Sequence, residues 1–503
     1  MIGFSGATAS AQSVWNGGGT DGNFSTALNW ASGVAPTSAV TTVLQIGGSS
    51  QTAINIDTPF SAQSLTFLSG ASAFTLSGNT LSLTGTGGVN VTNSSASVQT
   101  IAASMSVASG GFAATGANMT VSGNVAISGN NFTLTAGGGK TLTVSGALTG
   151  GITAGNFAIN AAGGTVVLSG ASTIGNTINI WNGNVVAGTS SSTTTGGAFG
   201  KGSVSLGLSG QSSSSILVSG AYTIGNNIRV ITNTNGAVYT LGGSTADIST
   251  YSGAISLGTS TAAGTAGMGV TLTAASGGRV NFTGGIRHET TSTAGNSSDA
   301  VTKTGAGIVA ISGTNNTYLG ITTVSAGTLL VNGTLSGTGA VSVASAAVLG
   351  GNGTVSGAVT VASGGILSAG DMDASGTSLT GTLTLGGGLA LNTGSTLKFD
   401  LGSASDLVAV TGNLILGGTL SLTAGSGFGA GTYELFSYSG TLTDNTLTVG
   451  TSPAGYAYTV DTSTAGVVNL QVVAVPEPAP LVLMGAGMAA FLLLRRRPAR
   501  CAA

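Results

Sequence analysis

The chain has 503 residues, of which 88 are glycine and 7 are proline; 41% of the residues are hydrophobic and only 5% are charged. This hydrophobic content excludes a chain kept disordered by charge, and the glycines lack the three-residue period of collagen, so a β-rich chain with many turns remains. The residues before Val475 carry 7 basic and 12 acidic side chains (7 − 12 = −5), which excludes a nucleic-acid-binding surface dense in Lys and Arg.

Residues 1–13 are interpreted as the remainder of an export segment or as a flexible N-terminus. Ala9-Ser10-Ala11 fits the small-residue pattern that precedes a secretory cleavage site. The charged and apolar stretches that normally come before such a site are missing. We therefore expect the full-length protein to begin upstream of Met1.

Three aromatic residues, Trp15, Phe24 and Trp30, cluster near the start of a chain that is otherwise poor in aromatic side chains. They can form an exposed platform on which sugar rings stack, or they can seal the first turn of a repeat protein. Because terminal repeats need a cap, the second interpretation is favoured.

Residues 14–370 show a pervasive strand pattern. Thr80–Thr84 and Thr141–Ser145 alternate polar and apolar residues with the period of two that buries one face of a sheet. Glycines and Asn/Ser clusters interrupt such runs about every 8–12 residues, where turns form. No helical period occurs before the tail, so the pattern predicts an all-β fold.

The strand pattern also repeats. Val166–Ile180 returns further along the chain as Ile216–Val230, and more loosely as Ile308–Val324; the first strand of each copy ends at Ser-Gly. Such repeats predict a β-solenoid with roughly 20–25 residues per turn. The alternative is a set of β-sandwiches, because residues 371–474 are less regular and are predicted as a separate C-terminal β region.

The segment Lys303–Gly333 resembles the autotransporter-associated β-strand repeat, and Val14–Pro36 resembles the segment that often begins proteins with this repeat. The resemblance implies that the body is a right-handed parallel β-helix. Parallel β-helices include polysaccharide lyases and hydrolases, so the sequence has to be searched for catalytic residues.

The carboxylate pairs are Asp371/Asp373 and Asp400/Asp406. Glycoside hydrolysis requires two carboxylates at a fixed separation. Asp371 and Asp373 lie in a Gly/Ser-rich stretch, which favours a turn or surface position over a calcium ligand or a catalytic pair. We expect no catalytic residue.

Three further motifs are weak candidates. Arg287-His288-Glu289 contains the only histidine and is predicted to be a solvated loop, so no metal site is expected from His288 and the single cysteine, Cys501. Gly137–Thr141 resembles a phosphate-binding loop but has Leu134 where the motif needs glycine. Thr-x-Thr strings such as Thr141–Thr143 resemble ice-binding faces but recur at no fixed spacing.

Residues 475–503 form a distinct tail. Pro476-Glu477-Pro478 precedes an apolar run from Leu481 to Leu494, and Arg495, Arg496 and Arg497 follow it. The run is slightly shorter than the roughly 17–25 residues of most membrane-spanning helices, but flanking arginines can reach the interface. It predicts a single C-terminal transmembrane helix, and the arginines place the body outside the cytoplasmic membrane.

This order of elements resembles the PEP-CTERM sorting segment of Gram-negative bacteria. The resemblance implies that an exosortase, a membrane protease-transpeptidase, recognises Pro476, Glu477 and Pro478, and that the protein accompanies exopolysaccharide and biofilm production. The sequence thus predicts an exported structural or adhesive protein of the cell surface or biofilm matrix, without enzymatic activity, cofactor or metal. Its predicted partners are exopolysaccharide or further copies of itself. The alternatives are a β-helix carbohydrate-active enzyme and an ice- or surface-binding solenoid.

Overall fold

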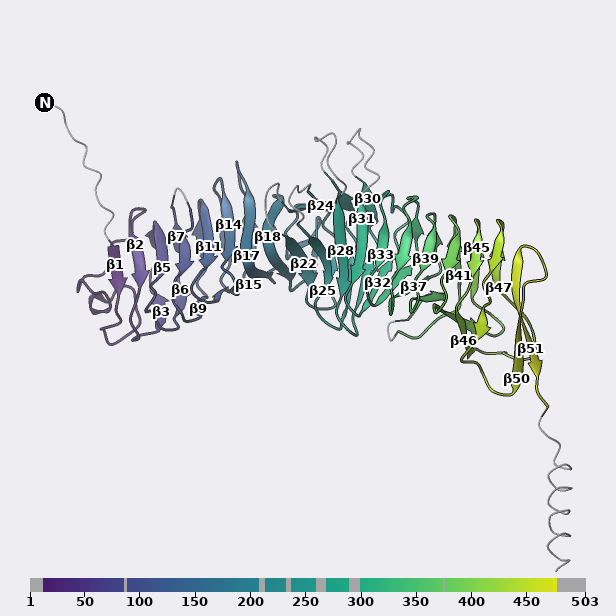
Figure 1. Ribbon diagram of the computed structural model, residues 1–503. Coiled ribbons are helices and arrows are strands. Elements are labelled where there is room, and N and C mark those ends of the chain that lie inside the picture. The colour runs from purple at the N-terminus through teal and green to yellow at the C-terminus, as the bar shows by residue number, and fades with distance from the viewer. Residues whose placement is uncertain are drawn as a thin grey trace, which may run out of the picture.

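The computed structural model describes residues 12–85, 88–207, 213–231, 237–258, 268–288, 299–373 and 376–476. In this part the chain winds into an elongated coil of short strands, with the N-terminal strands at one end and the C-terminal strands at the other (Figure 1). One 3-10 helix, η1 (Ala27–Asn29), occurs among the strands of the described residues. The predicted all-β fold is confirmed for these residues.

The strands stack in parallel ladders that form three faces, and most turns of the coil contribute one strand to each face. Face 1 begins with β1 (Gln12–Trp15), β2 (Val43–Ile46), β5 (Ser64–Phe67), β8 (Val91–Asn93), β11 (Gly110–Ala114), β14 (Phe132–Ala136), the first parts of β17 (Phe157–Leu168) and β18 (Ile178–Ala187), β21 (Val204–Leu206), β24 (Ile228–Val230), β27 (Ile255–Leu257) and β30 (Ile286–His288). It continues with β35 (Thr334–Leu335), β38 (Thr354–Val355), β41 (Thr382–Leu385), β44 (Leu407–Val410) and β47 (Gly431–Tyr438).

Face 2 is the longest unbroken ladder. It contains β3 (Ala53–Ile56), β6 (Thr75–Gly78), β9 (Gln99–Ile101), β12 (Met119–Val121), β15 (Thr141–Val144), the second parts of β17 and β18, β22 (Ser214–Val218), β25 (Tyr239–Gly243), β28 (Gly269–Ala274), β31 (Ala300–Thr304), β33 (Thr322–Val324), β36 (Val341–Val343), β39 (Val359–Val361), β42 (Leu389–Leu391), β45 (Leu414–Leu416) and β48 (Leu442–Asp444).

Face 3 consists of a five-stranded and a twelve-stranded sheet. The first contains β4 (Phe60–Ala62), β7 (Leu81–Leu83), β10 (Met105–Val107), β13 (Val125–Ile127) and β16 (Leu148–Gly150). The second contains β19 (Ser191–Ser192) with its antiparallel neighbour β20 (Gly196–Gly197), β23 (Thr223–Ile224), β26 (Ile248–Tyr251), β29 (Arg279–Phe282), β32 (Ile308–Ile311), β34 (Thr328–Val331), β37 (Val348–Gly351), β40 (Ile366–Ala369), β43 (Thr396–Leu401), β46 (Thr419–Ala424) and β49 (Thr448–Val449).

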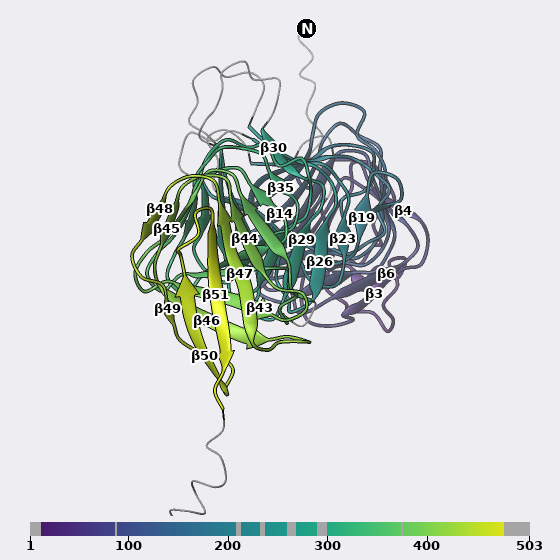
Figure 2. The ribbon, with the colours of Figure 1, turned by 90° about the vertical axis from the view of Figure 1, so that its right-hand side faces the viewer.

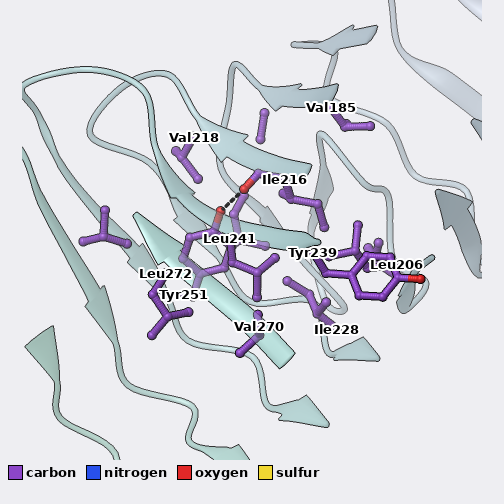
Figure 3. Close-up of a cluster of buried hydrophobic side chains, with 14 of the residues drawn as sticks. Val185, Leu206, Ile216, Val218, Ile228, Tyr239, Leu241, Tyr251, Val270 and Leu272 are labelled. Atoms are coloured by element: carbon purple, nitrogen blue, oxygen red, sulfur yellow. Dashed lines mark hydrogen bonds between the residues drawn. The ribbon is translucent and has the colours of Figure 1, made fainter. Parts of the chain in front are cut away.

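The interior is a continuous stack of apolar side chains, because alternate residues of each strand point inward. Val185, Ile216, Leu241 and Leu272 are register partners on successive strands of Face 2 and are all fully buried (Figure 3). Tyr251 is also buried, and its hydroxyl donates to the Ile216 carbonyl at 2.9 Å, which satisfies the one polar atom of this side chain. These long parallel ladders around a shared core are those of a β-solenoid, and they do not form antiparallel sandwiches.

The length of a turn varies more than the predicted range. Val341 pairs with Val359 across a short turn, whereas Ile255 pairs with Ile286 across a much longer one. The ladders keep their register, so the corners between faces accommodate the difference.

In the first two copies of the sequence repeat, the Ser-Gly site lies at the corner between Face 2 and Face 3, whereas in the third copy it follows β32 and lies at the corner between Face 3 and Face 1. A Cβ atom on Gly146 would lie 2.0 Å from the carbonyl oxygen of Gly123, and a Cβ on Gly170 would lie 2.1 Å from that of Gly146. Since stacked strands are about 4.8 Å apart, the corner has no room for a side chain that points along the axis. This close approach explains why glycine occupies positions 146 and 170 at this corner.

The first turn is sealed by aromatic side chains. Trp15, Phe24 and Trp30 are at most 3% exposed, and the rings of Trp15 and Trp30 pack edge to face at 5.3 Å. The Trp30 indole donates to the Phe24 carbonyl at 2.8 Å. This geometry agrees with a cap and leaves these three rings unable to serve as an exposed platform for a sugar.

The C-terminal end departs from the parallel pattern. The ladders continue across residue 370 into the predicted C-terminal β region, since Ile366 of β40 pairs with Thr396 of β43. At the end of Face 1, β51 (Val467–Ala474) pairs antiparallel with β47, and β50 (Tyr456–Asp461) pairs with β51 (Figure 2). These two strands cover the edge of the last turn.

The predicted sorting tail lies mostly outside the described residues. Pro476 is exposed two residues after β51, whereas Glu477, Pro478, the run from Leu481 to Leu494 and the Arg495–Arg497 cluster fall beyond the last described residue. Within the described ranges, no helix is long and apolar enough to cross a membrane. The transmembrane helix therefore stays a prediction.

Candidate functional site

The outward side of Face 2 carries a continuous column of polar side chains. Starting at β15, each member is the register partner of the next, one turn further along the coil. All but the nearly buried Ser215 are partly or fully exposed. We call this set the Face 2 polar column: Thr141, Thr165, Asn184, Ser215, Thr240, Thr271, Thr302, Thr323, Ser342 and Thr360.

This column could not be recognised from the sequence. The intervals between its successive members are unequal, because the corner loops between them differ in length: Thr240 to Thr271 is a long interval, and Thr323 to Ser342 is a short one. The absence of a fixed spacing of threonines in the sequence therefore does not mean that they fail to stack. The hydroxyls align because the strands that carry them share one register.

Ice binding would be expected to use a flat double array of threonines. On Face 2 such an array is much shorter than the Face 2 polar column. A second outward column of residues lies beside the Face 2 polar column. It contains threonine at β28 and β31, where Thr273 pairs with Thr304 next to Thr271 and Thr302. At β15 the partner of Thr143 is Val167, which interrupts the array. The described geometry therefore favours a single polar column.

Chemically, the Face 2 polar column offers hydrogen bonds without charge. A hydroxyl donates one hydrogen bond and accepts two, and neighbouring members lie about 4.8 Å apart. An elongated partner rich in hydroxyl groups can contact many of them at once. Each contact is weak, so binding strength would come from the number of contacts along the rod.

A second outward column lies on Face 1 and contains charge. Its members, from β18 to β30, are Asn179, Ser205, Arg229, Ser256 and Arg287, each the register partner of the next. The Arg287 Nε atom donates to Ser256 Oγ at 3.3 Å. We call these five residues the Face 1 arginine column.

The predicted solvated loop at Arg287-His288-Glu289 is wrong for its first two residues. Both lie on strand β30, and His288 Nδ1 is 2.6 Å from Oδ2 of Asp299, a residue with no exposed surface. The other carboxylate oxygen of Asp299 accepts the Met268 backbone N–H at 2.9 Å. Asp299 was missed because it is distant from His288 in the sequence; Glu289 lies outside the described residues.

Among the described residues, no nucleophile completes a catalytic triad with the His288–Asp299 pair. Within the described ranges, His288 Nε2 makes no hydrogen bond, so no serine or threonine hydroxyl of these ranges is placed to be activated by it. The pair therefore holds the start of β31 against β30 in this structure.

The first carboxylate pair takes part in a turn. Asp371 lies 3.4 Å from the Arg279 guanidinium and accepts the Met372 backbone N–H at 2.8 Å, while Asp373 accepts the Thr377 backbone N–H at 2.9 Å. Arg279 also donates to the Met372 carbonyl. These contacts agree with the predicted turn and fix the β40–β41 loop to Face 3.

The second pair includes a buried carboxylate. Asp406 is 1% exposed, and its two oxygens accept the backbone N–H groups of Gly381 and Asp400, each at 2.8 Å. Burial raises the pKa of Asp406 to about 7, although these two hydrogen bonds lower it. The side chain closes a corner between Face 3 and Face 1, which is a structural role.

This raised pKa predicts a pH dependence of stability. The folded pKa of about 7 exceeds the ordinary value of 3.8, so the stability contributed by protonated Asp406 is fully present below pH 3.8 and is lost as the pH rises through 7. Asp406→Asn does not titrate. We expect the variant to be less stable than the wild type at pH 4, and we expect the difference between their free energies of unfolding to be smaller at pH 8. The change in this difference is up to a few kcal/mol, because one pKa unit corresponds to ~1.4 kcal/mol. Denaturant titrations at both pH values measure it, and a constant deficit would contradict the prediction.

One open groove of about 380 Å³ lies where Face 1 strands begin. It is lined by Gly88, Val89, Ser109, Gly110, Asn130, Asn131 and Thr133. This lining contains hydroxyl and amide groups but no carboxylate, so it lacks the acid pair of a glycosidase. In addition, the described ranges contain no group of three or more His, Cys, Asp or Glu side chains arranged to hold a metal ion.

The glycine-rich segment that resembled a phosphate-binding loop is a strand connection. Gly137 to Lys140 connect β14 to β15, and the Lys140 backbone N–H donates to the Gly137 carbonyl at 2.9 Å. A strand, β15, follows it directly, so it lacks the helix N-terminus that binds phosphate.

Comparison with known proteins finds two family matches in the chain. Residues 301–331 match the passenger-associated transport repeat, and these residues form β31 to β34. Residues 474–497 match the PEP-CTERM protein-sorting motif, which is a signal for export and cell-surface sorting and implies processing by an exosortase. The predicted resemblances of Lys303–Gly333 and of the C-terminal tail are confirmed.

One curated protein is distantly similar. The chain is 39% identical over 106 residues to the adhesin BmaC autotransporter of Brucella suis biovar 1 (strain 1330), and the alignment covers 19% of this chain and 3% of the adhesin. The chain thus spans a small fraction of that protein's length. Together, the matches identify an exported protein with a PEP-CTERM sorting motif and autotransporter-like repeats, which has a distant relative among the adhesins.

Proposed function

We propose that the protein is a non-enzymatic structural and adhesive component of the cell surface or the biofilm matrix. The observation that carries this proposal is the Face 2 polar column, an uncharged row of hydrogen-bonding groups along the length of a stiff rod. Such a surface suits many weak contacts with an exopolysaccharide or with another copy of the chain. The coil is proposed to be right-handed, the sense that parallel crossover connections favour.

The tail is proposed to deliver the rod to this location. Pro476, the first residue of the sorting motif Pro476, Glu477 and Pro478, is exposed two residues after the last strand, so an exosortase can reach Pro476 without unfolding a turn. Leu481–Leu494 would hold the chain in the inner membrane until processing, with Arg495, Arg496 and Arg497 on the cytoplasmic side. Removal of the tail would then release the rod outward.

The experiment is fractionation and intact-mass measurement in the native host, with and without its exosortase. We expect the wild-type chain to be shortened near Pro478 and to leave the inner membrane only when the exosortase is present. A chain with alanine at positions 476, 477 and 478 should stay uncut and membrane-bound, whereas a Lys398→Ala control, at an exposed position of β43, should be processed normally. An uncut wild-type chain retained in the inner membrane would overturn the sorting part of the proposal.

A further inference from the structure

The two ends of the coil differ in how their outermost strands are covered. At the N-terminal end, the loop between β1 and β2 bonds to the first strand of each face. The N–H groups of Ala31, Phe24 and Ala39 donate to the carbonyl oxygens of Val14 at 2.8 Å, Asn55 at 3.0 Å and Ser61 at 3.0 Å, respectively. At the C-terminal end, β50 is the last strand of the seven-stranded sheet that ends Face 1 (Figure 1). In the described part of the chain, β50 therefore has an open edge.

The register with β51 identifies the backbone groups at this edge. The Val475 N–H donates to the Gly455 carbonyl at 2.9 Å, one residue before the β50–β51 ladder begins. Hydrogen-bonded and non-hydrogen-bonded residues alternate along an antiparallel pair. Tyr456, Tyr458 and Val460 therefore direct their backbone N–H and carbonyl groups away from β51, and no described strand receives them.

The edge of β50 is also long and unprotected. Natural proteins protect open edges with lysine, proline, a bulge or a very short strand. The six residues of β50, YAYTVD, contain no lysine or proline, and their ladder with β51 has no register shift. The last strands of Face 2 and Face 3, β48 and β49, have three and two residues and offer a partner few hydrogen bonds. An extended partner strand therefore fits β50 better than either of them.

We propose that two copies of the chain join end to end through β50, as an antiparallel pair centred on Tyr458. In this register Tyr458 lies opposite Tyr458 of the second copy, and Tyr456 lies opposite Val460. The backbone groups directed to the edge then all find partners. Aromatic pairs and aromatic–β-branched pairs stabilise neighbouring strands. Asp461, the one charged residue of β50, falls opposite Gly455, so no like charges meet.

The pair makes a longer rod with two equivalent halves. Strands of Face 1 stack along the axis, so pairing at β50 continues this sheet from one copy into the other (Figure 2). The loop that closes the N-terminal end prevents the same contact there, and a contact that uses the same patch of both copies closes after two. The expected assembly is therefore a dimer and not a fibre. The contact uses the end of the coil and not the Face 2 polar column, so the inference goes beyond the proposed function.

The first test is sedimentation velocity of the purified full chain in detergent, over a range of concentrations. We expect the wild type to form dimers. Tyr458→Lys would place two ammonium groups opposite each other and should raise the Kd of the dimer at least about tenfold, or ~1.4 kcal/mol. Thr382→Lys adds the same charge at an exposed position of β41, away from the edge, and should change the Kd less than about twofold. Thermal unfolding of both variants shows whether a loss of pairing reflects a loss of folding.

A cysteine cross-link tests the register without adding charge. In a Cys501→Ser background, Tyr458→Cys would place two thiols on residues whose Cα atoms are about 5.5 Å apart, which is within the reach of a disulfide. Oxidised glutathione should link this variant into dimers. Asp461→Cys, on the same strand, would lie roughly 20 Å from its counterpart in this register and should stay unlinked.

Four results would overturn the inference: a monomeric wild type, an unchanged Kd in Tyr458→Lys, equal cross-linking of the two cysteine variants, or assemblies that grow beyond two copies. The sorting experiment is independent of these outcomes. A chain that is processed and exported but stays monomeric overturns this inference alone, whereas an uncut chain retained in the inner membrane overturns the sorting proposal.

Discussion

Gly170→Ala is expected to disrupt the coil around its corner and to lower the free energy of unfolding by about 3 kcal/mol or more. The added Cβ would lie 2.1 Å from the Gly146 carbonyl oxygen and 2.6 Å from its carbonyl carbon. Both are backbone atoms of the preceding turn, so the clash can be relieved only by separating the turns. Hydrogen exchange of the peptides on either side of the corner, together with denaturant titration, measures the effect.

Gly175→Ala is the matched control for this substitution. Gly175 lies further along the same turn, is exposed, and has no atom within 4 Å of the position that an added Cβ would occupy. We expect the control to be neutral or slightly stabilising, because alanine reduces the entropy of the unfolded chain. If both variants changed the free energy of unfolding equally, the close approach of the turns would not be the reason why glycine occupies the corner.

The second large effect is expected at Lys303, a buried lysine within the passenger-associated transport repeat. It points into the core from β31 with no exposed surface, and its Nζ donates to the carbonyl oxygens of Thr304, Gly305 and Ala326 at 2.8, 2.8 and 3.0 Å. Lys303→Ala would leave these three carbonyl oxygens without their hydrogen-bond donor. Each loss is expected to lower the free energy of unfolding by about 1–3 kcal/mol. We expect faster hydrogen exchange across 301–331 and a lower denaturant midpoint, while Lys398→Ala, at an exposed site, should have neither effect.

Lys303 also has a pH signature that separates its charge from its packing. Burial lowers the pKa of this amine from 10.5 to about 8. Between these values the unfolded chain binds more protons than the folded one, so the stability contribution is complete above pH 10.5 and is lost as the pH falls to 8. Lys303→Met should abolish this dependence. If the methionine variant kept the same pH slope in thermal unfolding, the slope would have another source.

The first two copies of the sequence repeat occupy equivalent places in the coil, whereas the third begins on Face 3 and does not. Val166 pairs with Val185, and Val185 pairs with Ile216, so one period of the sequence repeat spans two turns of the coil. Strand alternation and Ser-Gly corners are local features, which explains why they could be read directly.

The candidate sites were less accessible to prediction. The sequence contains every threonine of the Face 2 polar column, yet their alignment depends on corner loops whose lengths differ from turn to turn. His288 was predicted in a solvated loop because the sequence shows only its charged neighbours, whereas the partner that buries it, Asp299, lies directly before the next strand of the coil. Arg229 was not singled out because its relation to Arg287 exists only through Ser256.

The sequence by itself determined the fold class, the repeat, and the sorting signal, because each is encoded over short stretches: period-two alternation, glycine at corners, and the order Pro-Glu-Pro, apolar run and arginines. Only the tertiary structure decided which side chains share a face. In a coil of stacked turns, neighbours on a face are one turn apart in space but a variable number of residues apart in the chain. The register of the ladders therefore sets the outer surface, and that surface is where a rod of this kind meets its partners.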